Sequence, residues 1–277
     1  MPRKMSPKTR PARDAVAGFT LVELAVVVAI VALLLGALLA PLATQHALRK
    51  NKEAERELRE IKEALIGFAV TNGRLPWPDT DFTPDGLENV PTPPLATPPP
   101  PCTVCEGLLP WQTLGTGRTD PWGRMYLYRI APEFGFPVLT GQPAGPDQFD
   151  MFDVGDKTGA GAILVSTRDL GKNIIVLTND AAAVVVSLGS NGNGGTNQDL
   201  TTISQAPVGT DERINSDGDT NPTAPVPHFY ARHLTLPTTG ACSDSVPGTD
   251  FCEFDDLVVW IPRVVLINRM VEAGLLP

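Results

Sequence analysis

Residues 18–23 read Gly-Phe-Thr-Leu-Val-Glu, and a run without charged side chains follows from Leu24 to Leu42. A helix over this run rises 1.5 Å per residue, so it is about 28 Å long, close to the ~30 Å of a bilayer's hydrocarbon core. The sequence therefore predicts a membrane-spanning helix over residues 19–42.

A basic leader, residues 1–18, precedes this helix and carries five Lys or Arg against one Asp. A secretory signal peptide has its apolar segment before the cleavage site, whereas here the apolar segment follows Gly18 and would be retained. The positive-inside rule places the leader in the cytoplasm, so everything after Leu42 should be extracytoplasmic.

This arrangement resembles the N-terminus of type IV pilins and pseudopilins. The resemblance implies that a membrane peptidase removes the leader after Gly18 and that the new N-terminal Phe19 is methylated. A carboxylate such as Glu23 costs about 2.5–3.5 kcal/mol at the centre of a bilayer, so such residues usually have a partner. The Phe19 amine of a neighbouring subunit can be that partner, which would set the register of assembly. The alternative is an ordinary signal anchor with Glu23 at the membrane edge.

A second helical half, residues 43–73, follows without a proline after Pro41. Leu58, Ile61, Leu65 and Phe68 recur at spacings of three and four, which is typical of an amphipathic helix. The opposite face is charged, and Asn72-Gly73 predicts the end of the helix. We expect this stem to continue the membrane helix and to pack beneath a sheet.

The rest of the chain divides into a proline-rich loop region, residues 74–118, and a head, residues 119–277, with a short C-terminal helix after Pro262 that ends at Gly274. The run Pro98–Pro101 has polyproline character. The expected strands are short, rich in β-branched or aromatic residues, and bounded by turn formers. They are 125–130, 163–166, 173–178, 184–188, 229–234 and 257–261.

Their connections are mostly too short for helical crossovers, which favours an antiparallel sheet. The predicted fold is therefore α+β and pilin-like: a long N-terminal α-helix, half membrane and half amphipathic, packed on a C-terminal antiparallel β-sheet head with long loops and a short C-terminal helix. Residues 119–128 and 186–192 are similar to segments of major pseudopilins of type II secretion. Asp120-Pro-Trp-Gly123 also reads as a turn on its own chemistry.

Four cysteines, Cys102, Cys105, Cys242 and Cys252, are candidates for disulfides outside the cytoplasm. Four cysteines allow three connectivities, and a pairing of Cys242 with Cys252 would close a short loop. Zinc is disfavoured because no second closely spaced pair or nearby histidines complete a site.

The whole chain carries a formal charge of −9, and removing the leader's +4 leaves −13, which disfavours a nucleic-acid surface. Acidic loops supply the oxygen ligands that calcium prefers. Calcium is the only cofactor we expect, and the alternative is a set of solvated turns. The candidate ligands are Asp217, Asp219, Asp255 and Asp256, with Asn215 beside them and Asp199 and Glu212 on weaker grounds.

No spacing of residues indicates an enzyme. The predicted function is a structural subunit of a type II secretion pseudopilus or a type IV pilus-like filament. Its implied partners are other pilin or pseudopilin subunits, a prepilin peptidase, and an inner-membrane assembly platform with a motor ATPase. It would span the inner membrane once with a periplasmic head, then join a filament in the periplasm or at the cell surface. The alternative is a signal-anchored periplasmic calcium-dependent binding module that does not polymerise.

Overall fold

The computed structural model describes residues 20–91, 104–135, 163–217 and 227–275, without the side chains of residues 35–44 and 217. Gly18, Phe19, Cys102, Asp219 and the run Pro98–Pro101 lie outside the described residues. The chain divides into two compact units, Met1–Leu48 and Arg49–Pro277.

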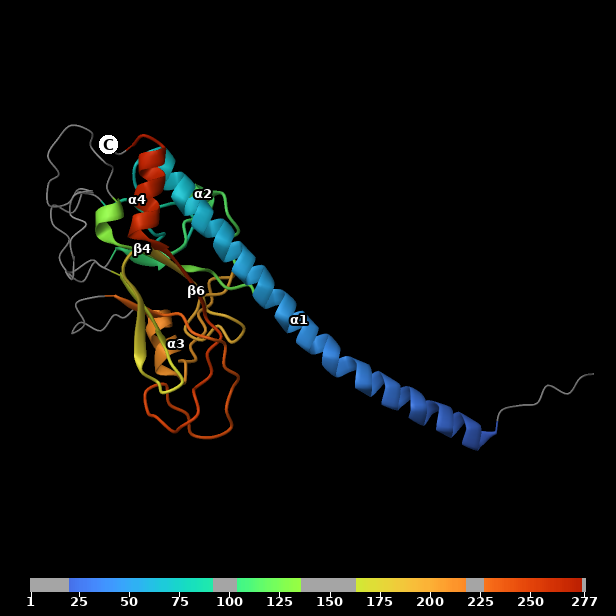
Figure 1. The fold of residues 1–277 in the computed structure, drawn as a ribbon. Coiled ribbons are helices and arrows are strands. Elements are labelled where there is room, and N and C mark those ends of the chain that lie inside the picture. The colour runs from blue at the N-terminus through green and yellow to red at the C-terminus, as the bar shows by residue number, and fades with distance from the viewer. Residues whose placement is uncertain (1–19, 92–103, 136–162, 218–226, 276–277) are drawn as a thin grey trace, which may run out of the picture. The chain divides into compact units, whose positions relative to one another are not determined.

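The first helix, α1 (Leu21–Asn72), contains both predicted halves and continues through Pro41 (Figure 1). It ends where Gly73 adopts a left-handed φ of 71° and donates its backbone N–H to the Ala69 carbonyl at 2.8 Å. A residue without Cβ adopts this conformation at little cost, so the predicted C-terminus of the stem is confirmed.

The stem buries the predicted apolar stripe. Leu58, Ile61 and Leu65 are at most 3% exposed, while Phe68 is only half-buried. The same face also buries Ala54, Ile66 and Ala69. These positions recur at helical spacing, so one side of the second half of α1 faces apolar neighbours in the head.

The head contains one six-stranded sheet. Its strands are β1 (Glu106–Leu108), β2 (Leu127–Ile130), β3 (Ile163–Arg168), β4 (Ile174–Ser187), β5 (His228–Tyr230) and β6 (Leu257–Pro262). The order is β1-β2-β4-β3-β5, and β6 pairs with β4. The α+β class is confirmed.

Three details of the predicted sheet are wrong. β3 and β5 pair in parallel, so the sheet is mixed and not purely antiparallel. The two strands expected at 173–178 and 184–188 are one strand, β4, which keeps a partner along its length because β3 pairs with its first part and β2 and β6 with its second part. The strand expected at 229–234 ends at Tyr230.

Four shorter helices complete the described fold: α2 (Trp111–Leu114), the 3₁₀ helix η1 (Pro132–Gly135), α3 (Thr210–Asp217) and α4 (Arg263–Glu272). The C-terminal helix was predicted, and it begins after Pro262 and is followed by Gly274 at φ 73°. It buries Leu266 and Met270.

The stem, the sheet and α4 share one apolar core. Leu65 of α1, Tyr128 of β2, Val185 of β4 and Met270 of α4 belong to the same buried cluster. The second half of α1 therefore shares a buried apolar core with the sheet.

Candidate functional site

The start of α1 is a reciprocal cap made by Thr20 and Glu23. The Glu23 backbone N–H donates to Thr20 Oγ1 at 3.2 Å, and Glu23 Oε2 accepts from the Thr20 backbone N–H and hydroxyl, each at 2.9 Å. This capping box satisfies backbone donors that a helix start otherwise leaves unpaired. The sequence contains the signature of this box, a Thr followed three residues later by a Glu, so Glu23 has a capping role beside the expected role in assembly.

The first turns of α1 expose apolar side chains on every face. Leu21 is 86% exposed, Leu33 74% and Val26 52%. The remaining exposed large apolar residues of this stretch are Val22, Leu24, Val27, Val28, Ile30, Val31 and Leu34. Because successive residues are about 100° apart around a helix, such a run leaves no polar face. A helix that is apolar all round is stable in water only when something covers it.

Within the described part of the chain, no helix combines the length and apolar character needed to cross a bilayer.

The Asp120 turn has the structural role that the sequence predicted. Asp120 Oδ1 accepts from the backbone N–H groups of Trp122 at 3.0 Å and Arg124 at 2.9 Å, and Oδ2 accepts from the Ser187 hydroxyl at 2.7 Å. Gly123 has a φ of 85°, which only glycine adopts readily. Since Asp120 is 4% exposed and its oxygens are taken up by these donors, it fastens this turn to β4.

The stem is also held to the head by polar contacts. Tyr126 donates its hydroxyl to Glu57 Oε2 at 2.7 Å, and burial raises the pKa of the Glu57 carboxyl. The Tyr128 hydroxyl donates to the Pro76 carbonyl at 3.0 Å, and the Trp77 indole N–H donates to the Gly135 carbonyl at 2.9 Å. The first bond holds the stem to the residue that precedes β2, and the bonds at Pro76 and Trp77 fix the segment that follows α1.

A disulfide joins Cys242 to Cys252, which is one of the pairings that the sequence left open, and Cys105 is also disulfide-bonded. The loop between Cys242 and Cys252 is anchored from inside as well. Arg232 lies 2.9 Å from Asp244 and 3.1 Å from Asp211 of α3, and all three side chains are at most 4% exposed. Removing one member of such a buried ionic group leaves an uncompensated charge, so the group ties the disulfide loop to α3.

Of the predicted calcium ligands, Asp255 and Asp256 come together, and Glu212 of α3 joins them: their nearest carboxylate oxygens lie within 4.8 Å of one another. Asp219 and the side chain of Asp217 lie outside the described residues. Asp199 is not part of this group. Glu212, which the sequence offered on weaker grounds, thus belongs to the group although it is 43 residues from Asp255 in the sequence.

Hydrogen-bond donors of the protein itself contact this acidic group. Asp255 Oδ2 accepts from the Ser190 hydroxyl at 2.7 Å and the Asn191 backbone N–H at 2.8 Å, and Glu212 Oε1 accepts from the Asp255 backbone N–H at 2.8 Å. Burial, followed by the charge of Asp255, raises the pKa of Glu212 to about 8. Burial also raises the pKa of Asp256 well above its usual range.

The predicted ligand neighbour Asn215 has a structural role. Its side chain exchanges two hydrogen bonds with the Tyr230 backbone and donates to Asp256 Oδ2 at 3.0 Å. The remaining carboxylate oxygens are ligands of the type that calcium prefers, so the group suits a divalent cation chemically, and calcium binding there stays a prediction.

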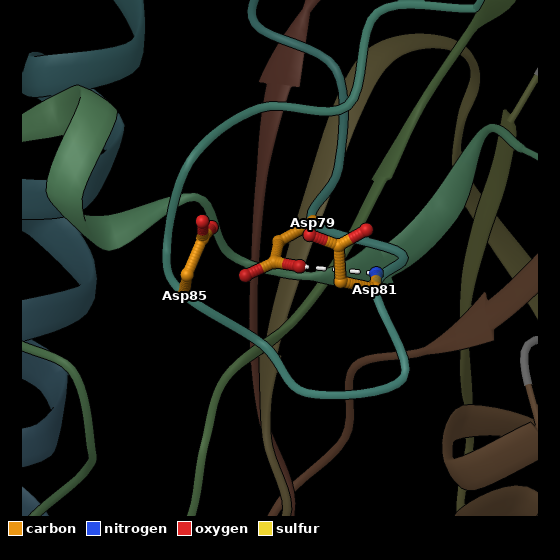
Figure 2. A group of neighbouring side chains, drawn as sticks. All are labelled: Asp79, Asp81 and Asp85. Carbon is orange, nitrogen blue, oxygen red and sulfur yellow. Dashed lines mark hydrogen bonds between the residues drawn. The ribbon is translucent and has the colours of Figure 1, made fainter.

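A second acidic group, Asp79, Asp81 and Asp85, lies in the loop after the stem (Figure 2). Asp79 is 1% exposed and accepts from the backbone N–H groups of Asp81 at 3.2 Å and Gly86 at 2.7 Å. Asp85 accepts from the Leu87 backbone N–H at 2.9 Å. These are the local side-chain-to-backbone bonds of turns, so the geometry accounts for this group as a loop framework.

Residues 13–39 match the family model of the prokaryotic N-terminal methylation motif. This motif is the signature of type IV pilin- and pseudopilin-like proteins, so the resemblance seen in the sequence is confirmed. Gly18, Phe19 and Glu23 all lie within the matched segment. Comparisons with curated proteins and with solved structures found no match.

Proposed function

We propose that this chain, which carries the type IV pilin-like methylation signature, is a structural subunit of a filament, cleaved after Gly18 and assembled through α1. The observation that carries the proposal is the methylation motif over residues 13–39, joined to the first turns of α1, which expose apolar side chains on all faces. A motif for processing and a helix that needs covering are the two requirements of such a subunit.

Before assembly, the apolar half of α1 holds the protein in the inner membrane as a single span, with the head in the periplasm. Assembly moves this half from lipid into a bundle of identical helices, so its apolar surface remains covered in both states. Cleavage after Gly18 leaves an amine on Phe19, and the Glu23 carboxylate of the next subunit neutralises it. This pairing fixes the axial stagger between neighbours.

The filament we propose is a type II secretion pseudopilus. The Asp120-Pro-Trp-Gly123 turn and the segment 186–192, which are similar to major pseudopilins, support this choice over a surface pilus. The partners are other pilin or pseudopilin subunits, the prepilin peptidase, and the assembly platform with its motor ATPase. The role is mechanical and not enzymatic.

Mass spectrometry of the membrane-extracted protein tests the processing step. The expected mature chain begins at Phe19 and carries a methyl group on its amine. Gly18→Val, which places a branched side chain at the cleaved bond, should leave the leader in place, whereas Ala15→Val serves as a matched change within the leader. An intact leader on the wild-type protein in its host would favour the signal-anchored binding module instead.

Deletion of the gene distinguishes the kinds of filament. We expect protein secretion to fall while twitching motility and DNA uptake are kept. Loss of twitching or DNA uptake with normal secretion would indicate a surface pilus and would contradict the pseudopilus assignment. Restoring the phenotype with the wild-type gene, but not with the Gly18→Val variant, would connect it to processing.

A further inference from the structure

The first part of β4 exposes an unusual number of apolar side chains. Ile174 is 52% exposed, Val176 55% and Leu177 44%, and Leu170 in the preceding turn is 98% exposed. Ile175 is 46% exposed, so consecutive residues that point to opposite faces of the strand are all accessible. An exposed apolar patch of about 300–600 Å² is the largest that a typical monomer has and is often functional.

One backbone edge of this segment has no strand partner among the described residues. Ala181 pairs with Ile163 of β3 and with Pro262 of β6, so β3 and β6 lie on opposite edges of β4. β6 pairs only with Ala181–Ser187 and ends where α4 begins. On the β6 side, residues 174–178 therefore present free main-chain donors and acceptors.

Within the part of the chain that the structure describes, this edge also lacks the usual protection. Natural sheets cover their edges or place Lys or Pro on them to prevent pairing with other chains. Residues 174–179 read Ile-Ile-Val-Leu-Thr-Asn and contain no proline and no charge. An exposed sheet edge with unpaired backbone groups is what an extended peptide uses when it adds to a sheet as a further strand.

The charge around the edge specifies the occupant. Asp169 lies in the turn at one end of the segment and Asp180 at the other. Lys172, in the turn before the segment, is 5% exposed, and its ammonium donates to the Ser243 and Asp250 carbonyls. Two copies of this edge would bring like charges together, whereas a strand with basic ends would be attracted.

We propose that the free edge of β4, residues 174–178, binds an extended apolar segment of a partner protein that is flanked by Lys or Arg. The segment adds to the sheet as a strand beside β4, its backbone bonds to the free edge, and its apolar side chains cover Ile174–Leu177. Its basic ends lie near Asp169 and Asp180.

The test measures binding of fluorescent peptides to the full-length protein in detergent micelles, with empty micelles as the blank. The probes are Lys-Val-Thr-Val-Thr-Val-Lys and the same peptide with Glu in place of both Lys. We expect the basic peptide to bind more tightly and to weaken with added salt. Val176→Lys should lower its affinity about tenfold or more, since it adds a like charge to the edge, and Asp180→Asn should lower it less.

Val246→Lys is the matched control, because Val246 is 52% exposed but lies in the disulfide loop. It should bind the peptide like the wild type. Circular dichroism confirms that each variant is folded. No binding above the micelle blank, equal binding by the Val176→Lys and Val246→Lys variants, or tighter binding of the Glu peptide would overturn the proposal. The proposal would also be overturned if the wild-type protein formed a dimer that binds no peptide and that the Val176→Lys substitution dissociates.

Discussion

Thr20 and Glu23 form reciprocal hydrogen bonds within one chain, because each side chain accepts from the other residue's backbone N–H. Only Oε2 of Glu23 is engaged in this cap among the described contacts. The second oxygen can therefore accept from a neighbouring Phe19 amine while the cap is kept. The residue that we propose for assembly thus also shapes the helix start that presents it.

The two roles of Glu23 can be separated by substitution. Glu23→Gln keeps a capping acceptor but removes the charge, whereas Thr20→Ala removes the cap at a cost of about 0.5–2 kcal/mol and keeps the charge. We expect Glu23→Gln and Glu23→Ala to impair polymerisation strongly and Thr20→Ala to impair it mildly. Filament yield by electron microscopy is the measurement, and wild-type yield from Glu23→Gln would rule out charge pairing.

Asp120→Ala should destabilise the head by about 3 kcal/mol, because it leaves three donors without their acceptor in a buried turn. Ser187→Ala removes one of these donors together with its bond, so its cost should be about 1 kcal/mol. Thermal unfolding of both variants measures the difference. Equal melting temperatures for the two would show that the Asp120 turn is not the anchor that its hydrogen bonds indicate.

Replacing both Cys242 and Cys252 by serine should lower the free energy of unfolding by about 2–4 kcal/mol. Arg232 still binds Asp244, so we expect faster hydrogen exchange to be confined to the loop between the two positions. Chemical denaturation and hydrogen exchange together test this. Faster exchange throughout the sheet would mean that the disulfide, and not the buried ionic group, holds the loop.

Tyr126→Phe should cost about 1 kcal/mol, because the Glu57 carboxylate loses its hydroxyl donor in a half-buried position. Glu57→Gln keeps an acceptor for the hydroxyl and should change stability little. Glu60→Gln, on the exposed side of the stem, is the control. Urea denaturation gives the three values, and a cost for Tyr126→Phe no greater than for the control would mean that apolar packing alone seats the stem.

Stability should fall as pH rises through the range set by Glu212. Its pKa is raised from 4.5 to about 8 in the folded state, so folding favours the protonated carboxyl. The contribution is complete below pH 4.5 and is lost as the pH approaches 8, because the unfolded state then releases its proton more easily. Glu212→Gln should flatten this slope in melting temperature, whereas Glu272→Gln, on an exposed residue, should not.

Calcium provides a second measurement on the same group. If calcium binds Glu212, Asp255 and Asp256, it competes with protons, so it should raise the melting temperature more at pH 8.5 than at pH 5. The increase should vanish in Glu212→Gln. An increase of equal size in that variant, or with magnesium in place of calcium, would contradict a calcium site while leaving the pH prediction intact.

Local patterns predicted the elements that depend on neighbours in the chain. The stripe through Leu58 and Leu65 predicted the buried face of the stem, and Pro262 and Gly274 bounded the last helix. α3 was missed because its sequence, Thr-Asp-Glu-Arg-Ile-Asn-Ser-Asp, has no apolar stripe. It is held instead by buried polar contacts of Asp211 and Asn215, whose partners are distant in sequence.

The sequence predicted two strands, 173–178 and 184–188, where the structure has the single strand β4, and contacts distant in sequence explain this difference too. Asn179-Asp180 resembles a turn, yet β3 and then β6 hold the backbone extended on either side of it. Two residues that favour a turn can remain extended when neighbouring strands pair with the backbone on both sides of them, because tertiary context overrides local preference. The parallel pairing of β5 with β3 likewise follows from the long connection through α3, not from any local pattern.

By itself the sequence determined the processing motif, the apolar helix and the Asp120 turn, because each depends on residues close together in the chain. Only the tertiary structure decided that Glu212 joins Asp255 and that one edge of β4 has no strand partner among the described residues. The physical reason is that these features are distances between segments far apart in sequence. Such distances depend on the packing of the whole sheet, and a short stretch of sequence does not determine that packing.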